Sequence, residues 1–348
     1  MEQQIGICGH FQGNIPTSSG QVIKTRIITQ ELTRIYGRNR ILTVDSHGGI
    51  ANLGRLFFQS ACLLRKCDVV ILLPAHNGLL ILLPFYYIAN KLFHKRIIYV
   101  VIGGWLIEYM KRFFWLKYIL KRISHILVET SSMKQKLNDL HFSNVLVMPN
   151  FKRLDICKKE DLSNNSRNSL ALCTFSRVMK EKGIEEIIDA VKQANQHFGK
   201  DIYTLDIYGK VEDSYQKRFA ELIASVPQYI KYNGLVDYNN TTTTLKKYFA
   251  LVFPTLFFTE GVPGTIIDAY AAGLPVIASR WENYNDVVDD NLTGIGYNFS
   301  STKDLIQTLI NIAQHPEHIT LLRENCLSKA KMFIPEFAIT PLIQAINL

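Results

Sequence analysis

The chain has 348 residues, of which 47% are hydrophobic and 20% are charged, and its formal net charge is +9. This length favours two domains, and the apolar content is ample for two packed cores, which argues against a disordered chain. The six cysteines form no C-x-x-C pair and no metal-binding spacing, and Met1–Gly13 lacks the basic stretch of a signal peptide. We therefore expect a cytoplasmic protein with reduced thiols.

The positive charge is concentrated in the first half of the chain. Residues 1–150 contain 18 Lys and Arg against 7 Asp and Glu, whereas residues 151–348 contain 21 against 23. Much of the excess is interleaved with aromatic residues in segments 91–96 and 109–122. This pattern fits peripheral contact with an anionic membrane surface at the inner face of the cytoplasmic membrane, and it equally fits core helices with a solvated basic face. No nucleic-acid reading motif accompanies it, so nucleic acid is not an expected partner.

Short apolar runs alternate with helical periodicity through residues 1–155. The expected strands are Ile5–Cys8, Arg40–Val44, Val69–Leu73, Ile97–Val101, His125–Glu129 and Asn144–Met148. The stretch Val69–Ala89 is apolar enough to suggest a membrane span, but Pro74, Gly78 and Pro84 interrupt it. We interpret it as a buried strand followed by a helix from about Leu79.

The same alternation restarts after a polar stretch at residues 150–168, which has the composition of a linker. The expected elements are strands Leu170–Phe175, Tyr203–Tyr208 and Ile230–Tyr232 and helices Ile184–Phe198, one ending near Ala224 and one near Thr244–Phe249. The alternation predicts an α/β fold with two doubly wound, Rossmann-like parallel sheets. The predicted domains are residues 1–155 and 169–334, followed by residues 335–348.

The segment from Phe253 to Ala278 predicts a strand, a glycine-rich turn, a short helix and a second buried strand. Glu260 stands at the turn and Asp268 lies within the helix. A helix amino terminus offers free N–H groups and a positive dipole end, which suit a phosphate. Carboxylates beside it are suited to bind hydroxyl groups. A diphosphate flanked by two polyols indicates a nucleotide sugar.

This segment resembles the E-x7-E signature of the family 4 retaining glycosyltransferases, here as Glu260 to Asp268, in the EGxPGTxxDA form of bacterial capsule, O-antigen and exopolysaccharide enzymes. Trp281, Asn283 and the segments 18–20, 175–183 and 205–209 fit that family in the same order. The resemblance is specific over residues 170–296 and general before them. It implies the GT-B fold, with an N-terminal acceptor domain and a C-terminal nucleotide-sugar domain facing a central cleft. The last helix, after Pro335, would cross back to the first domain.

The resemblance also assigns roles to residues of this chain. Glu260, Arg177 and Lys182 are the implied catalytic residues, with Glu260 contacting the transferred sugar and the two cations offsetting the diphosphate. Asp268 would bind the ribose, and the backbone near Leu235 the nucleobase. The complete set implied for donor binding is Gly20, Ser176, Gly209, Leu235, Gly261, Val262, Pro263, Gly264, Thr265 and Asp268. Each has a simpler alternative, such as a helix cap for Glu260 or a solvated helix residue for Asp268.

The sequence contains no D-x-D motif, so we expect neither a bridging metal nor any other cofactor. Retention of anomeric configuration is implied by the family, with UDP as the expected nucleotide and GDP as an alternative. The expected acceptor is a glycan, in particular one linked to polyprenyl diphosphate, because that would explain the basic and apolar first domain.

The acceptor side of the site is less defined, because the His that many relatives carry in the first domain has no clear counterpart. The candidates are His10, His76, Gly103, Gly104 and Trp105. A lone His in a loop is more often structural.

Three other functions remain open from the sequence. A dinucleotide oxidoreductase should show G-x-G-x-x-G after the first strand, and Gly6, Gly9 and Gly13 lack that spacing. A non-enzymatic sugar- or membrane-binding module would not need Arg177, Lys182, Glu260 and Asp268 together. A GT-B nucleotide-sugar 2-epimerase would release nucleotide without any acceptor.

Overall fold

The computed structural model describes residues 3–12, 20–47, 52–162, 170–237 and 240–348. The chain forms two compact units, Met1–Lys152 together with Pro335–Leu348, and Arg153–Ile334. The final segment belongs to the first unit as helices α15 (Pro335–Ala338) and α16 (Thr340–Asn347).

The first unit is built on a six-stranded parallel sheet in the order β2-β1-β3-β4-β5-β6. Its strands are β1 (Ile5–Gly9), β2 (Ile41–Asp45), β3 (Val69–Leu73), β4 (Arg96–Val100), β5 (His125–Val128) and β6 (Val145–Val147). Every residue of β1 and of β3 is buried. Continuous apolar runs of this kind suit strands whose two faces are both covered by helices.

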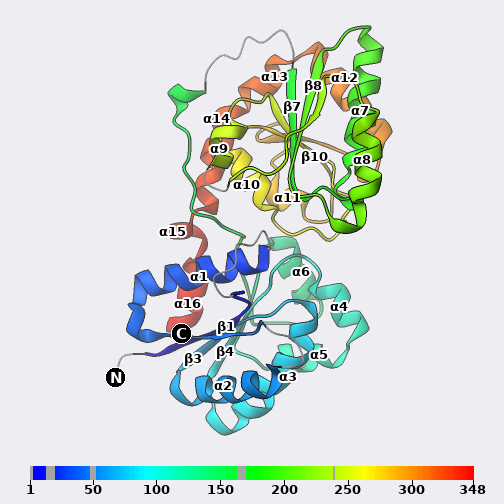
Figure 1. Cartoon of the computed structure of the whole chain (residues 1–348). Helices are drawn as coiled ribbons and strands as arrows, with labels where there is room; N and C mark the ends of the chain where they lie inside the picture. Colours follow the sequence, from blue (N-terminus) through cyan, green and yellow to red (C-terminus); the bar gives the residue numbers. More distant parts are fainter. Residues whose placement is uncertain (1–2, 13–19, 48–51, 163–169, 238–239) are drawn as a thin grey trace. The chain divides into compact units, whose positions relative to one another are not determined.

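The helices of the first unit cover both faces of this sheet. Besides α15 and α16, the α-helices described in this unit are α1 (Gly20–Tyr36), α2 (Leu53–Lys66), α3 (His76–Phe93), α4 (Leu106–Arg112), α5 (Trp115–Leu120) and α6 (Ser131–Asp139). One core cluster packs α1 and α16 against one face of the sheet. Another packs the helices α2, α3, α4, α5 and α6 against the opposite face, and Figure 1 shows α1 and α2 on these two sides. The predicted division of the apolar stretch into β3 and α3 is confirmed. In the described part of the chain, no helix is long and apolar enough to cross a membrane.

The second unit contains another six-stranded parallel sheet, in the order β12-β11-β10-β7-β8-β9. Its strands are β7 (Leu170–Phe175), β8 (Tyr203–Tyr208), β9 (Ile230–Tyr232), β10 (Ala250–Phe253), β11 (Val276–Ser279) and β12 (Gly294–Tyr297). The predicted doubly wound α/β architecture is thus confirmed for both sheets.

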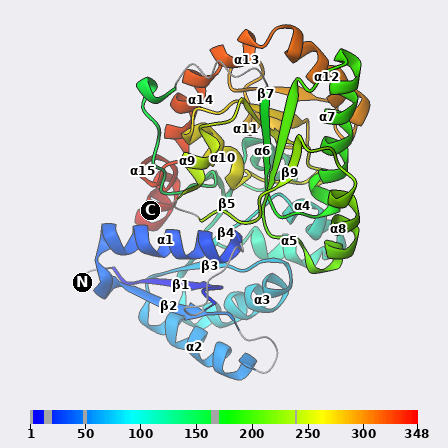
Figure 2. The same ribbon diagram turned by 45° about the horizontal axis from the view of Figure 1, so that its top comes forward.

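Helices also cover both faces of the second sheet. Its α-helices are α7 (Ile184–Phe198), α8 (Gln216–Ala224), α9 (Thr241–Leu245), α10 (Gly264–Ala271), α11 (Tyr284–Val287), α12 (Thr302–Gln314), α13 (Glu317–Leu321) and α14 (Arg323–Ala330). One core cluster contains residues of α7, α8 and α12 and the other contains residues of α9, α10 and α14. Figure 2 shows these two groups on opposite sides of the sheet.

Two features of the second unit differ from the expectations. The helix expected near Thr244–Phe249 lies earlier, at Thr241–Leu245, because the Phe249 N–H already donates to Ala171 O of β7 where β10 begins. Residues 153–162, expected in a linker, pack against the second unit, where the Cys157 N–H donates to Ala271 O over 2.8 Å. The rest of the expected linker, 163–169, lies outside the described residues.

Candidate functional site

The strand order of the second sheet reverses between β7 and β10. β7 and β10 lie side by side at its centre, while the connections that leave them cover opposite faces. Ligands of open parallel sheets bind beyond the carboxyl ends of the strands at such a switch point. Ser176 and Arg177 follow β7, and Thr255 lies just after β10.

A glycine fixes the loop after β7 against the end of β10. Gly183 has φ +71°, and a Cβ built on it would lie 1.9 Å from Pro254 O. The Leu256 N–H donates to Glu181 O over 2.8 Å across the same contact. Only glycine allows this approach, which places Lys182 at the turn that carries Glu260.

Lys182 and Glu260 form an ion pair at this point. Lys182 Nζ lies 2.6 Å from Glu260 Oε2, and Thr255 Oγ1 donates to the same oxygen over 3.2 Å. Their side chains are 11% and 20% exposed. The Lys182 ammonium also lies 5.5 Å from the centroid of the Phe253 ring, within cation–π range. The two residues are therefore held in place but remain accessible.

The backbone of the turn is anchored from the next strand. Asn283 Nδ2 donates to Glu260 O over 2.7 Å, and Ser279 Oγ donates to Thr255 O over 2.8 Å. Thr255 and Ser279 were absent from the site residues expected from the sequence. Asn283 was noted in the sequence only because related sequences carry an Asn at this place. In the structure, its side-chain amide anchors the turn from a position shortly after β11.

Helix α10 begins directly after this turn. Pro263 is its N-cap residue, and no side chain in the described ranges caps it. Thr265 Oγ1 is buried and has no hydrogen-bond partner among the described residues. An uncapped amino terminus leaves N–H groups for a bound anion. Asp268 lies inside the helix, is 7% exposed and has interactions of its own.

The remaining donor-side candidates of the second unit lie at neighbouring strand ends. A Cβ on Gly209 would lie 1.6 Å from Ser176 O, so these two loops touch, and the Gly209 N–H donates to Gly234 O next to Leu235. Arg177 does not join the Lys182–Glu260 pair; its guanidinium instead lies 3.4 Å from Glu212 in an exposed contact.

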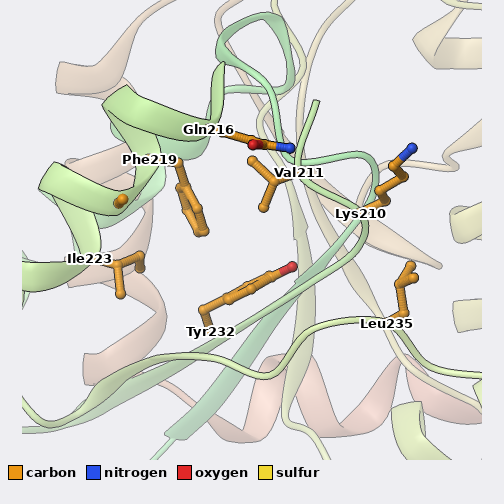
Figure 3. A pocket seen from close by; sticks show the side chains of 8 residues that line it. Lys210, Val211, Gln216, Phe219, Ile223, Tyr232 and Leu235 are labelled. Atoms are coloured by element: carbon orange, nitrogen blue, oxygen red, sulfur yellow. The ribbon is translucent and has the colours of Figure 1, made fainter. Parts of the chain in front are cut away.

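A hollow of about 540 Å³ opens beside these loops. Figure 3 shows Phe219 and Ile223 of α8 facing Tyr232 across it, with Val211 and Leu235 at its sides. The rings of Phe219 and Tyr232 meet edge to face at 5.0 Å, and the Tyr232 hydroxyl donates to Gly209 O over 2.8 Å. The walls are thus mainly aromatic and aliphatic.

The acceptor-side candidates lie in the first unit. His10 and His76 follow β1 and β3 and both line one hollow. His10 Nε2 and His47 Nδ1 are 2.9 Å apart, and burial, followed by the charge of His47, lowers the pKa of His10. The His76 ring stacks on Trp105 at 3.9 Å, and burial lowers its pKa.

The candidates Gly20, Gly103, Gly104 and Trp105 also belong to the first unit. Gly103 has φ +85° and lies with Gly104 in the turn before Trp105. The Trp105 indole N–H donates to Ile102 O over 2.7 Å. Gly20 is the exposed first residue of α1, and the loop preceding it, residues 13–19, lies outside the described residues. Among the described residues, no cluster of three or more His, Cys, Asp or Glu has a metal-binding arrangement.

Comparisons with known proteins bear on the family and the fold. Residues 169–315 match the family described as Glycosyl transferases group 1. The chain is 26% identical over 227 residues to the UDP-N-acetylglucosamine--peptide N-acetylglucosaminyltransferase GtfA subunit of Streptococcus pneumoniae, covering 62% of this chain and 42% of that protein. It is 26% identical over 162 residues to the alpha-monoglucosyldiacylglycerol synthase of Acholeplasma laidlawii, covering 46% of this chain and 39% of that protein. The chain thus spans less than half the length of these two curated relatives.

A solved structure, Anabaena Alr3699/HepE in complex with UDP-glucose, superposes with a TM-score of 0.77 at 14% identity and covers 99% of both chains. At this identity the likeness concerns the fold. The chain therefore has the fold of the GT-B glycosyltransferases, and its residues 169–315 match the group 1 glycosyltransferase family.

Proposed function

We propose that the chain is a retaining glycosyltransferase that transfers a sugar from a UDP-sugar to a glycan acceptor. The observation that carries the proposal is the Lys182–Glu260 pair, held at 2.6 Å before the uncapped start of α10. This pair lies in the part of the chain that matches the group 1 family. The names of the relatives, one of which uses UDP-N-acetylglucosamine, support UDP as the nucleotide.

The donor diphosphate would lie at the start of α10. The N–H groups of Gly261, Gly264 and Thr265 and the helix dipole favour negative charge there, and Lys182 supplies a full positive charge. In the free protein Glu260 neutralises Lys182. A diphosphate would compete for this ammonium and release Glu260 towards the sugar hydroxyls. Arg177, in its weak exposed pair with Glu212, is available as a second cation.

The nucleoside would extend from there across the ends of β7 and β8. Asp268 is the proposed ribose ligand, and the backbone near Leu235 is the proposed contact of the base. The aromatic hollow in Figure 3 adjoins Leu235, so a planar base has apolar surface beside it. The loops that carry Gly209 and Ser176 are in contact at these strand ends.

The transfer itself needs no enzymic nucleophile. The bond from the anomeric carbon to the diphosphate oxygen breaks, and a bond from that carbon to the acceptor hydroxyl forms on the same face. The departing diphosphate oxygen takes the proton of that hydroxyl. Lys182 and the start of α10 stabilise the negative charge on the leaving group, and Glu260 offsets the positive charge on the sugar. We propose that these groups replace a divalent metal.

The acceptor is proposed to be a glycan of surface polysaccharide biosynthesis, such as one linked to polyprenyl diphosphate. The resemblance of residues 260–269 to capsule and exopolysaccharide enzymes supports this role, and one relative acts on a lipid by name.

We also propose that the first unit contacts an anionic membrane. Its basic-aromatic surface consists of the exposed side chains Ile88, Leu92, Phe114 and Tyr118 with the cations Lys91 and Arg122. Tyr87 of α3 meets Tyr118 of α5 edge to face at 6.3 Å, which joins the two halves of the surface. Lys91 lies 5.6 Å from the Tyr87 ring and Arg122 lies 3.5 Å from the Tyr118 ring. Such side chains combine headgroup attraction with insertion of rings at the interface.

Glu260→Gln tests the proposed chemistry. The amide keeps the size of the side chain and the contact with Thr255 but removes the charge, so we expect transfer to fall by about 100-fold or more. The measurement is UDP release from a panel of UDP-sugars with glycoside and polyprenyl-diphosphate-sugar acceptors.

The matched control is Glu221→Gln on the exposed side of α8, which should leave transfer unchanged. Wild-type turnover in Glu260→Gln would overturn the assignment, and so would UDP release that is independent of any acceptor.

A further inference from the structure

The first unit contains a second candidate site, at the point where its own strand order reverses. β1 and β3 are neighbours at this point, and the helices that follow them, α1 and α3, lie on opposite faces of the sheet. A hollow of about 650 Å³ opens at the carboxyl ends of these strands. Its size is in the range of small-molecule sites, and its place is where an open parallel sheet binds ligands.

None of the described residues that line this hollow is an Asp, Glu, Lys or Arg. Its two imidazoles, His10 and His76, have pKa values lowered chiefly by burial, which favours their uncharged form. The first half of the chain is strongly basic, yet the hollow offers no full positive charge to a phosphate. It is suited to an uncharged ligand.

Part of the lining of the hollow is polar. His10 follows β1, Ser46 follows β2, and Asn77 lies in the first turn of α3. These side chains offer both donors and acceptors, as the hydroxyl groups of a sugar require. His10 is positioned by its contact with His47 at 2.9 Å.

The rest of the lining is mainly apolar and is supplied by two helices. Leu53 and Leu56 of α2 and Ile81 and Leu82 of α3 all line the hollow. Ile81 is 38% exposed, and on the same side of α3 follow Phe85, Ile88 and Leu92, at helical spacings of four, seven and eleven residues. The row is about 16 Å long at the rise of an α-helix. Phe85 is fixed in it by stacking on Phe57 of α2 at 4.6 Å.

We propose that this hollow binds an uncharged glycoside with an alkyl tail, its sugar among His10, Ser46 and Asn77 and its tail along the apolar row of α3. As the acceptor, such a glycoside rests on the proposed function, and it narrows the acceptor to an uncharged glycolipid in place of a glycan linked to polyprenyl diphosphate. The outer end of the row, Ile88 and Leu92, belongs to the basic-aromatic surface, so the tail would run from the hollow to the membrane.

The first test is a titration of the full chain with octyl glucoside, below its micelle concentration, and with methyl glucoside. Methyl NMR signals of isoleucine and leucine report the position of the ligand. We expect octyl glucoside to bind at least tenfold more tightly and to shift the signals of Leu53, Leu56, Ile81 and Leu82. Equal affinity for the two glucosides, or shifts confined to other methyl groups, would overturn the proposal.

The second test changes the row itself. Ile81→Gln retains a good helix former at a partly exposed position, and it should reduce octyl glucoside binding to the level of methyl glucoside. The matched control Ile35→Gln changes an isoleucine of α1 that is 40% exposed and does not line the hollow, and it should leave both affinities unchanged. An unchanged preference for octyl glucoside in Ile81→Gln would contradict the proposal.

A separate UDP titration distinguishes the two proposals, because UDP is assigned to the second unit. Octyl glucoside binding without UDP binding would support the hollow and refute the glycosyltransferase. UDP binding without a preference for the alkyl tail would support the glycosyltransferase and refute the glycolipid site in the hollow.

Discussion

Gly183 is the residue on which the position of Lys182 depends. Its φ of +71° and the 1.9 Å that would separate an added Cβ from Pro254 O leave no space for a side chain. The loop after β7 can approach β10 only because glycine lacks this atom, and the approach brings the ammonium of Lys182 to Glu260.

Gly183→Ala should therefore lower both stability and donor affinity. Left-handed strain and overpacking each cost about 1 to 3 kcal/mol, so we expect the free energy of unfolding to fall by about 2 kcal/mol or more. UDP should bind more weakly because Lys182 is displaced. Urea unfolding and titration calorimetry with UDP measure the two effects.

Gly199→Ala is the matched control for this change. Gly199 has a similar φ of +64°, but nothing lies within 4 Å of its added Cβ. It should cost only the left-handed strain, about 1 kcal/mol, and leave UDP affinity unchanged. Equal effects of the two substitutions on stability and on UDP binding would show that the Pro254 contact has no special role.

The sequence named Lys182 and Glu260 but did not predict that they form an ion pair. That contact joins positions 78 residues apart and depends on the adjacency of β7 and β10, which no local pattern encodes. Thr255 and Ser279 were missed for a similar reason, because hydroxyl groups that hydrogen-bond to a turn do not occur at a recognisable spacing in the sequence. Arg177 was expected beside the diphosphate, and its pairing with Glu212 is likewise a matter of tertiary packing.

At the scale of elements, the buried apolar strands could be predicted from the sequence, whereas the glycine-rich strand β12 could not. β3 and β7 follow the expected bounds because both of their faces are covered and their residues are almost all apolar. β8 also follows them, although Thr204 and Asp206 interrupt its apolar residues. β12 was not expected, since two of its four residues are glycines. One of them, Gly294, is required by the partner strand, because its Cβ would lie 2.2 Å from Val276 O.

The basic-aromatic surface on α3 and α5 leads to a prediction at this scale. Leu92 and Phe114 are 78% and 81% exposed. Replacing both by Glu removes apolar contact and adds repulsion of about 1 kcal/mol per charge at an anionic surface. We expect the double variant to bind phosphatidylglycerol-containing vesicles at least tenfold more weakly in co-sedimentation at low salt.

The control for this experiment carries the same two types of substitution elsewhere. Leu321→Glu with Phe337→Glu changes residues that are 73% and 66% exposed and lie outside the surface. It should bind vesicles nearly as well as the wild type. Wild-type vesicle binding by Leu92→Glu/Phe114→Glu, or no binding by the wild type at all, would refute membrane contact through this surface.

At the scale of the whole molecule, the two halves of the sequence differ in charge although they share an architecture. Residues 1–150 carry the excess of 18 Lys and Arg over 7 Asp and Glu, while the remainder is nearly balanced. Both sheets are parallel, doubly wound and six-stranded. The alternation of strands and helices was enough to predict this architecture, whereas the packing of residues 153–162 on the second unit was not predictable from their polar composition. That the units face a cleft stays a prediction.

The most direct test of the central claim is a thermal-shift comparison of UDP, GDP, CDP, ADP and NAD, each with and without EDTA. A diphosphate at about a hundred times its dissociation constant stabilises the protein by about 2.7 kcal/mol, which is readily visible. We predict stabilisation by UDP that persists in EDTA and is lost in Lys182→Ala. No response to any nucleoside diphosphate, or a response to NAD alone, would contradict a glycosyltransferase that binds its donor through Lys182 and the start of α10.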